Sequence, residues 1–208
     1  MSSLDRPLIE VSKIVKRFYL PKPILSGRTH KFVEALKGIS LNIARGEIVA
    51  VIGESGSGKS TLAKSIALLV KPDAGTISIN GVITNSLSKN DQTALQQKIH
   101  LIFQDPYSSL NPRLNIGDII MEPLVIQKKV NRRDFVNLAA TSLTEVGLHP
   151  SNMSKFPHQF SGGQRQRIAI ARAIIAKPEL IIADEPLSAL DVSIQSQIIN
   201  LLVDLKKK

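Results

Sequence analysis

The sequence predicts an α/β fold with a mainly parallel sheet, and three observations support this prediction. Short apolar segments such as Leu180–Ala183 have the composition of strands buried on both faces. These segments alternate along the chain with segments of helical periodicity. A longer helical stretch, at about residues 105–160, interrupts the alternation as an insertion would. Buried strands that alternate with helices are typical of the α/β class.

The first half of the chain contains mainly predicted strands. One of them, Leu8–Leu20, partly alternates and is rich in β-branched residues. Another, Glu47–Ile52, is almost continuously apolar, which predicts a strand buried on both faces. In chain order we expect a strand (Leu8–Leu20), a loop (Pro21–Lys31) and two strands joined by a turn at Arg45–Gly46 (Ser40–Ala44 and Glu47–Ile52). A helix (Thr61–Val70) and an alternating strand (Gly75–Ile83) follow.

The second half is mainly helical. Leu95–Asp105 passes from a helix into a buried strand, and the turn-rich segment Gln104–Asn115 follows it. Helical periodicity then runs from Ile116 to about Gly147, with expected breaks at Pro123 and near Asn131. The remaining elements are a helix (Gln164–Ala176), a short buried strand (Leu180–Ala183) and a last helix (Val192–Lys208). The apolar residues of the last helix have helical spacing: Ile194, Ile198, Leu201, Leu202 and Leu205.

Composition limits the classes of function. The 208 residues suffice for one domain with a sizeable core, and the absence of cysteine excludes disulfides and thiolate metal sites. No apolar run is as long as a signal-peptide core or a membrane span, so we expect a soluble chain, or one attached to a membrane through a partner. The net charge of +10 favours nucleic acid or an anionic membrane surface, or it forms a solvated basic face. Two Tyr, six Phe and no Trp leave few rings to stack on bases.

A glycine-rich loop follows the predicted strand Glu47–Ile52 and precedes a predicted helix, which is the context of a phosphate-binding P-loop. Its glycines let the backbone curl so that N–H groups point at phosphate oxygens, and the helix N-terminus adds partial positive charge. We expect Lys59 to reach the β- and γ-phosphates of ATP and Ser60 to offer its hydroxyl to Mg²⁺. The expected ATP-binding residues of the loop are Gly53, Glu54, Ser55, Gly56, Ser57, Gly58, Lys59, Ser60 and Thr61.

Two acids end the predicted strand Leu180–Ala183. Ligands bind at the carboxyl ends of strands in open α/β sheets, so this position suits catalytic carboxylates. We expect Asp184 to hold Mg²⁺, mostly through water, and Glu185 to act as the base that activates the attacking water. Gln104 ends another predicted strand and could contact both Mg²⁺ and that water, although an ordinary loop glutamine fits the spacing equally well.

The order of these motifs resembles the ATP-binding subunits of ABC transporters. The resemblance includes GESGSGKST at Gly53–Thr61, SGGQRQR at Ser161–Arg167, LIIADE at Leu180–Glu185 and SALD at Ser188–Asp191, and it covers essentially the whole chain. The segments FQDPYSSLNPR and FPHQFSGGQRQRIAIARA are similar to the peptide and nickel importer branch, especially to the second ATP-binding subunit of dipeptide and oligopeptide permeases.

The resemblance implies a head-to-tail dimer of ATP-binding domains. The P-loop of one domain would hold ATP, and the signature of the other would cover its γ-phosphate. The implied signature residues are Ser161, Gly162, Gly163 and Gln164, and the implied dimer-interface loop is Ser188, Ala189, Leu190 and Asp191. An aromatic ring of the first strand would stack on adenine; Phe18 fits this role, Tyr19 is the rival, and a core position for Phe18 is the alternative.

The fold implied by the resemblance is a P-loop NTPase (RecA-like) core with an N-terminal antiparallel β subdomain and an inserted α-helical subdomain. We expect one domain over residues 1–208, with the core in 1–104 and 165–208 and the helical signature subdomain in 105–164. Related proteins continue into a further core strand and a histidine that contacts the γ-phosphate, but no histidine follows Asp191 here. We therefore expect a domain that is truncated at its C-terminus and lacks its last core strand.

The leading functional hypothesis is ATP hydrolysis that powers peptide import, with ATP and Mg²⁺ as cofactors. The implied partners are a second ATP-binding subunit, identical or different, two transmembrane permease subunits and, indirectly, a substrate-binding protein, on the cytoplasmic side of the inner membrane. Nickel or antimicrobial-peptide transport, a truncated remnant without catalysis, and a soluble ATPase that acts on nucleic acid are the alternatives. A soluble ATPase that acts on nucleic acid would be expected to contain long coiled coils or tandem domains, and the sequence contains neither. We therefore expect no nucleic-acid partner.

Overall fold

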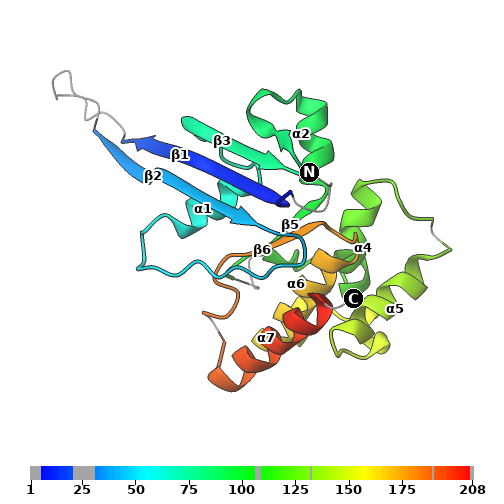
Figure 1. Ribbon diagram of the computed structural model, residues 1–208. Coiled ribbons are helices and arrows are strands. Elements are labelled where there is room, and N and C mark those ends of the chain that lie inside the picture. Colours follow the sequence, from blue (N-terminus) through cyan, green and yellow to red (C-terminus); the bar gives the residue numbers. More distant parts are fainter. Residues whose placement is uncertain (1–5, 21–30, 106–108, 132, 189, 207–208) are drawn as a thin grey trace, which may run out of the picture. The chain divides into compact units, whose positions relative to one another are not determined.

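A computed structural model describes residues 6–20, 31–105, 109–131, 133–188 and 190–206 (Figure 1). It divides into two compact units, one up to Ala94 and one from Leu95 onward. The first unit contains β1 (Ile9–Tyr19), β2 (Phe32–Ile43), α1 (Lys59–Ile66), β3 (Ala74–Ile79) and β4 (Val82–Ile83), and α2 (Lys89–Gln96) spans the boundary. The second contains β5 (Ile99–Ile102), α4 (Ile116–Ile126), α5 (Phe135–Glu145), α6 (Gly162–Ile174), β6 (Leu180–Ala183) and α7 (Val192–Lys206).

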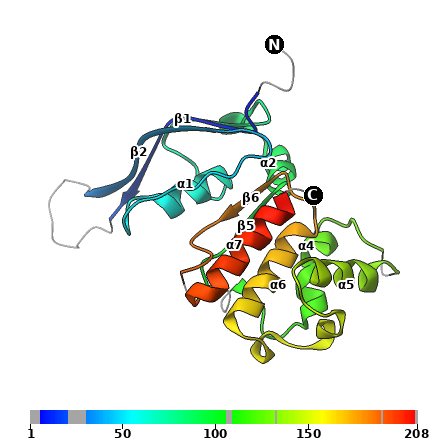
Figure 2. The ribbon, with the colours of Figure 1, turned by 60° about the horizontal axis from the view of Figure 1, so that its bottom comes forward.

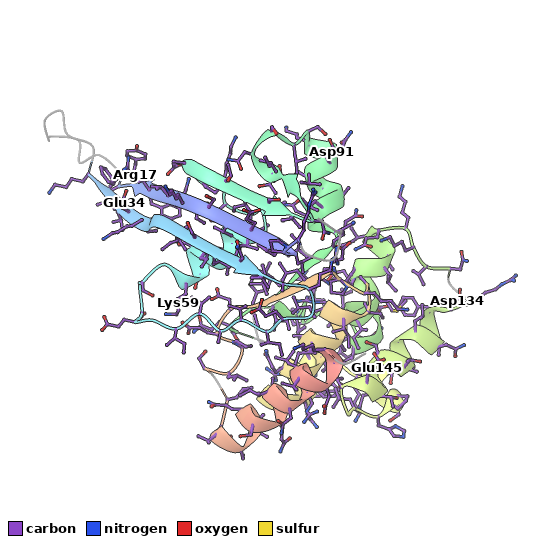
Figure 3. The ribbon with its side chains drawn as sticks, viewed as in Figure 1. Arg17, Glu34, Lys59, Asp91, Asp134 and Glu145 are labelled. Carbon is purple, nitrogen blue, oxygen red and sulfur yellow. The ribbon has the colours of Figure 1, made fainter. Side chains whose placement is uncertain are left out.

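The sheet of the first unit is antiparallel and has the strand order β2-β1-β3-β4. One face of β1 is buried through Ile9, Val11 and Ile14, as the partial alternation in the sequence predicts. Two ion pairs tie its polar side to its neighbours: Arg17 Nε lies 2.9 Å from Glu34 on β2 (Figure 3), and Lys16 Nζ lies 2.9 Å from Asp73 before β3. The hydrogen bond from Lys16, with a second from the backbone N–H of Arg17, holds the pKa of Asp73 below its usual value.

The second unit is built around α6. This helix packs against α4, α5, α7 and β5, and Figure 2 shows it between α7 and α4. The core of the unit includes Ile116, Leu143, Ile168, Ile170 and Ile198, all of them fully buried. The apolar residues predicted on one face of the last helix lie on this core, which confirms that prediction: Ile194, Ile198, Leu201, Leu202 and Leu205.

Parallel pairing is limited to β5 and β6 among the described residues, so the expectation of a mainly parallel sheet is wrong for this part of the chain. The larger sheet is the antiparallel one that the family resemblance implies. The strand β6 is also less covered than predicted, since three of its side chains are half-buried and that of Ala183 is exposed. Within the described residues it pairs with β5 along one edge.

The predicted strand Glu47–Ile52 is not formed. This segment belongs to no ladder among the described residues, and its apolar side chains are exposed, Ile52 by 93%. A strand requires the N–H and C=O groups of a neighbour, and none of the described strands supplies them. The family resemblance implies a further strand that lies between Glu47–Ile52 and Leu180–Ala183 and pairs with both. The described residues contain no such strand.

Two smaller predictions about the helices had different outcomes. The break near Asn131 is confirmed, since α4 ends at Ile126 and α5 begins at Phe135. The break at Pro123 is wrong, because this proline lies inside α4, near its last turn. There it removes one N–H donor, while its own carbonyl still accepts from Gln127 N. None of the helices within the described ranges is long and apolar enough to cross a membrane.

His100 on β5 gives the second unit a pH-dependent stability. Burial lowers the pKa of His100 below its ordinary value of 6.5, and hydrogen bonds to the backbone at Ala173 and Gln97 offset this only in part. The unfolded chain then binds a proton more readily than the folded chain. We therefore expect the stability of the wild-type protein to fall as the pH drops through 6.5. Thermal melts between pH 8 and pH 5 should show a smaller loss for His100→Gln; an equal loss in both proteins would contradict this.

Candidate active site

The phosphate-binding loop leads directly into α1, as the sequence predicts, although the helix begins at Lys59 rather than at Thr61. Gly58 is the N-cap and has a left-handed backbone with φ 98°. Within the loop, Ser57 N donates to Glu54 O at 3.2 Å, and Leu62 N donates the first helical bond to Gly58 O at 2.8 Å. Lys59 and Ser60 therefore lie in the first turn of α1, where backbone N–H groups lack helical acceptors and attract anions.

The ammonium group of Lys59 folds back over the loop (Figure 3). Its Nζ donates to Gly53 O and to Glu54 O, each at 2.8 Å. The charge is thus held at the loop rather than extended into solvent, and the two carbonyls are neutral acceptors that a phosphate could replace. This position fits the predicted contact with the β- and γ-phosphates.

Gly58 offers a direct test of the loop conformation. A Cβ at this position would lie 2.2 Å from Ala35 O on β2, in addition to requiring a left-handed backbone. We expect Gly58→Ala to displace the loop and to weaken ATP binding by at least about tenfold in an equilibrium titration, since each 1.4 kcal/mol is a factor of ten. Gly56→Ala is the matched control, because Gly56 also has a positive φ, of 80°, but its Cβ would meet nothing within 4 Å. Both substitutions carry the backbone cost of about 1–2 kcal/mol, so the clash with β2 should make the loss of affinity at Gly58 at least about tenfold greater than the loss at Gly56. Equal effects of the two substitutions would contradict the close approach of the loop to β2.

A second cluster forms where the parallel strands β5 and β6 end. Ile102 pairs with Ala183 at these ends, which brings Gln104 next to the acidic pair. Gln104 Nε2 donates to Glu185 Oε2 at 2.9 Å and to Ser188 Oγ at 3.3 Å. Asp184 is half-buried and its N–H donates to Ile102 O at 3.0 Å, whereas Glu185 is exposed. The structure thus brings Gln104, Glu185 and Ser188 together, which favours the predicted site role of Gln104 over that of an ordinary loop residue.

The oxygen donors of this cluster suit Mg²⁺. That ion usually keeps several waters and binds one or two carboxylates together with substrate phosphates. The carboxylate of Asp184 and the amide oxygen of Gln104 are donors of this kind. Among the described residues no group of three or more His, Cys, Asp or Glu side chains forms a metal site of its own. A carboxylate and an amide oxygen at one strand edge are donors that fit a metal which also binds substrate phosphates.

The signature segment caps α6. Ser161 is the N-cap, and its side chain accepts from Gln164 N at 3.4 Å, while Gln164 Oε1 accepts from Ser161 N at 3.0 Å. This reciprocal capping box begins the helix at Gly162, two residues before the predicted start. Gly163 also allows close packing, because a Cβ at this position would lie 2.7 Å from a methyl carbon of Ile194 on α7.

The loop between β6 and α7 is held by Gln195. This residue of α7 donates from Nε2 to Leu187 O at 3.2 Å and to Leu190 O at 2.9 Å. Asp191 O accepts from the N–H groups of Ile194 and Gln195 and thereby begins α7. The predicted interface residue Ala189 lies outside the described residues. Gln195 carries no motif, so its role could not be found from the sequence.

Both candidate adenine-stacking rings are exposed on β1. Phe18 is 44% exposed, with Lys16 Nζ 5.6 Å from its ring centre, and Tyr19 is 65% exposed and meets Phe32 edge to face. The core position considered for Phe18 is therefore wrong. Because neighbouring strand residues point to opposite faces, one of the two rings at most can stack on a given adenine. Phe18 and Tyr19 therefore stay alternatives for the stacking ring.

Three arginines of α6 fasten the segments around it, and no motif in the sequence predicts this. Arg165 donates to Pro157 O, Arg167 to Val146 O, and Arg172 to Ser109 O, at 2.7–2.8 Å. Burial lowers the pKa of Arg172, while Glu122, 3.9 Å away, acts in the opposite direction. An arginine that interrupts the apolar face of a predicted helix is the sequence feature that could indicate such hydrogen bonds.

Comparison with known proteins places this chain in a family. The family model described as ABC transporter matches residues 36–188. The chain is 45% identical over 203 residues to a putative oligopeptide transport ATP-binding protein, YkfD, of Bacillus subtilis, and it covers 60% of that relative. It is 45% identical over 179 residues to the di/tripeptide transport ATP-binding protein DppF of Pseudomonas aeruginosa, of which it covers 55%. These alignments include 97% and 86% of this chain. Since they cover 60% and 55% of the two relatives, the chain spans little more than half of the relatives' length.

Solved structures agree with this assignment. The dimeric ATP-binding cassette MJ0796, in a post-hydrolysis state bound to ADP and Pi, matches with a TM-score of 0.82 and 32% identity. The match covers 96% of this chain and 83% of the cassette. The cbiO1 protein of Clostridium perfringens, part of the ABC transporter complex cbiONQ, matches with a TM-score of 0.80 and 28% identity over 98% of this chain and 75% of that one. The chain belongs to the ABC transporter family.

Proposed function

We propose that this chain binds and hydrolyses ATP to power the import of peptides. The observation that carries the proposal is the contact between Gln104 and Glu185 at the carboxyl ends of β5 and β6. A P-loop alone supports nucleotide binding. An exposed carboxylate and an amide at one strand edge add the groups that a hydrolytic step needs.

In the proposed reaction each residue has one role. Lys59 and the N–H groups at the start of α1 hold the β- and γ-phosphates. Glu185 accepts a proton from the attacking water, whose oxygen bonds to the γ-phosphorus as the bond to the bridging oxygen of ADP breaks. Gln104 orients that water. Ser60, Gln104 and Asp184 are the residues that would hold Mg²⁺, which would neutralise charge on the phosphate oxygens when bound.

The remaining predicted residues act between chains in this proposal. Ser161, Gly162, Gly163 and Gln164 would cover the γ-phosphate of ATP bound to a partner subunit, and the segment 188–191 would lie at the dimer interface. The position of this segment at the N-terminus of α6 supports this role, since the first turn of a helix attracts anions. Phe18 or Tyr19, both exposed, would stack on adenine. The related cassette MJ0796 is dimeric in its solved structures.

Peptides are the proposed cargo because relatives carry names that refer to them. YkfD and DppF are named for oligopeptide and di/tripeptide transport, and a third relative, GsiA of Shigella dysenteriae, is named for glutathione import and is 47% identical over 201 residues. We infer that the subunit works on the cytoplasmic side of the inner membrane with two permease subunits. A substrate-binding protein would act indirectly. Nickel or antimicrobial-peptide transport remains the alternative cargo.

Transport by intact cells tests this proposal. A strain that expresses the protein from its own locus should take up labelled dipeptide or tripeptide, and Glu185→Gln should abolish that uptake. Uptake of Ni²⁺ serves as the second readout. Loss of peptide uptake with normal Ni²⁺ uptake supports the proposal, whereas normal peptide uptake in the variant contradicts it.

A second candidate function is nucleotide binding without turnover. The observation that favours it is the absence of any ladder for residues 47–52 among the described residues, which leaves the entry to the P-loop unsupported. Phosphate release by the purified 208-residue chain distinguishes the two functions. A rate no faster than that of Glu185→Gln, with ATP bound, would favour this second candidate.

A further inference from the structure

Glu185 has an unusual backbone. Its φ is 47°, in the left-handed region that residues with side chains seldom adopt. Such a conformation persists only when surrounding contacts fix it, and it is frequent at functional sites. The contacts that fix Glu185 therefore bear on where its carboxylate points.

Ser188 supplies two of these contacts. Its backbone N–H donates to Glu185 O at 3.2 Å, and its hydroxyl donates to the same carbonyl at 3.0 Å. The second bond depends on the side chain, so it distinguishes serine from other residues at this position. Together the two bonds close a turn that begins at Glu185, the residue with the positive φ, and they hold its carbonyl group in place.

The same hydroxyl also contacts the amide that holds the Glu185 side chain. Gln104 Nε2 donates to Ser188 Oγ at 3.3 Å and to Glu185 Oε2 at 2.9 Å. A hydroxyl can donate one bond and accept others, so Ser188 satisfies both roles at once. The serine thus joins the backbone of Glu185 to the residue that orients its carboxylate.

The position of Ser188 is set within its own chain. Gln195 on α7 donates to the carbonyls of Leu187 and Leu190, which lie on either side of Ser188 in the chain. These contacts hold the loop before any second subunit is considered. The sequence resemblance assigns Ser188 only to a dimer interface, which leaves this contact within the chain unexplained.

We propose that Ser188 is a positioning residue for Glu185 in the same chain. Its hydroxyl fixes the turn at Glu185 and the amide of Gln104, and the two together aim the carboxylate at the water that it activates. The inference rests on the proposed function, in which Glu185 is the base.

The test compares steady-state ATP hydrolysis by Ser188→Ala, Ser188→Thr and the wild-type protein. We expect Ser188→Ala to lower kcat about 10- to 100-fold, because a small displacement of a catalytic group has effects of this size, and to leave KM within about twofold. Ser188→Thr retains the hydroxyl at an exposed position and should recover most of kcat. Ser196→Ala is the control, since Ser196 is also exposed and its hydroxyl also donates to a backbone carbonyl, that of Val192.

A second measurement separates this role from one across a dimer interface. The Ser188 hydroxyl bonds within its own chain, so its loss should leave the proposed dimer interface of segment 188–191 intact. Sedimentation with ATP and Mg²⁺ should therefore give equal dimer fractions for Glu185→Gln and for Glu185→Gln combined with Ser188→Ala. A lower dimer fraction in the double variant would overturn the proposal in favour of an interface role. An unchanged kcat in Ser188→Ala, or a Ser188→Thr variant as slow as Ser188→Ala, would also overturn it. If Glu185→Gln itself hydrolyses ATP normally, the proposed function fails instead.

Discussion

Lys59→Ala should remove measurable ATP binding at micromolar protein concentrations. The Nζ of Lys59 is held at the loop by Gly53 O and Glu54 O, where it can meet phosphate oxygens without a large movement. Hydrogen bonds to charged groups contribute about 1.5–3 kcal/mol each, and contacts with two phosphates together supply several kcal/mol. Each 1.4 kcal/mol is a factor of ten, so we expect an affinity at least about a hundredfold lower. Equilibrium titration with a fluorescent ATP analogue measures this.

Lys64→Ala is the matched control for that experiment. Lys64 lies on the same helix, near its C-terminal end, and is exposed, so its removal changes the net charge equally without touching the loop. Its affinity should stay within about twofold of the wild-type value. Unchanged affinity in Lys59→Ala, or equal losses in both variants, would contradict the assignment of the P-loop.

Glu185→Gln should stop turnover and preserve ATP binding. The amide has the shape of the carboxylate and can still accept the bond from Gln104 Nε2, which is 2.9 Å long in the wild-type protein. It cannot accept the proton of the attacking water. General base catalysis contributes about 10²–10⁴-fold, and we expect kcat to fall by that factor. Phosphate release measures the rate, and equilibrium titration measures the unchanged affinity.

Glu179→Gln provides the control for this second prediction. Glu179 precedes β6 on the same chain and forms an exposed ion pair with Lys98 at 2.9 Å, away from the acidic end of the strand. Surface pairs of this kind contribute little to stability, so its hydrolysis rate should match that of the wild-type protein. A Glu185→Gln variant with at least a tenth of the normal rate would show that another group takes the proton.

The sequence predicted elements whose own residues determine their structure. The last helix is an example, because the spacing of Ile194, Ile198 and Leu201 alone defines a face that the core then covers. The meeting of Gln104 and Glu185 was also foreseeable, since both follow buried segments that fit neighbouring strands. Where an element depends on a distant neighbour, prediction failed: residues 47–52 have the composition of a strand but no ladder partner among the described residues.

The finer geometry of the site could not be read from the sequence. The positive φ of Glu185, the bonds from Ser188 and the contacts of Gln195 are features of one loop, and no local sequence pattern predicts them. The capping box of Ser161 and Gln164 could have been predicted, because a serine followed three residues later by a glutamine is its usual sequence pattern. That signal was interpreted only as a signature for a partner's nucleotide. The division of the chain into a core and a helical subdomain of residues 105–164 stays a prediction.

The most direct test of the central claim is to identify the nucleotide that the protein holds over time. Wild-type protein, Glu185→Gln and Lys59→Ala are incubated with Mg²⁺ and radiolabelled ATP, passed through a desalting column, and analysed for bound ATP and ADP. The account predicts ADP on the wild-type protein, unhydrolysed ATP on Glu185→Gln and no nucleotide on Lys59→Ala. Wild-type protein that keeps its ATP unhydrolysed for as long as Glu185→Gln does would contradict the claim that this site hydrolyses ATP.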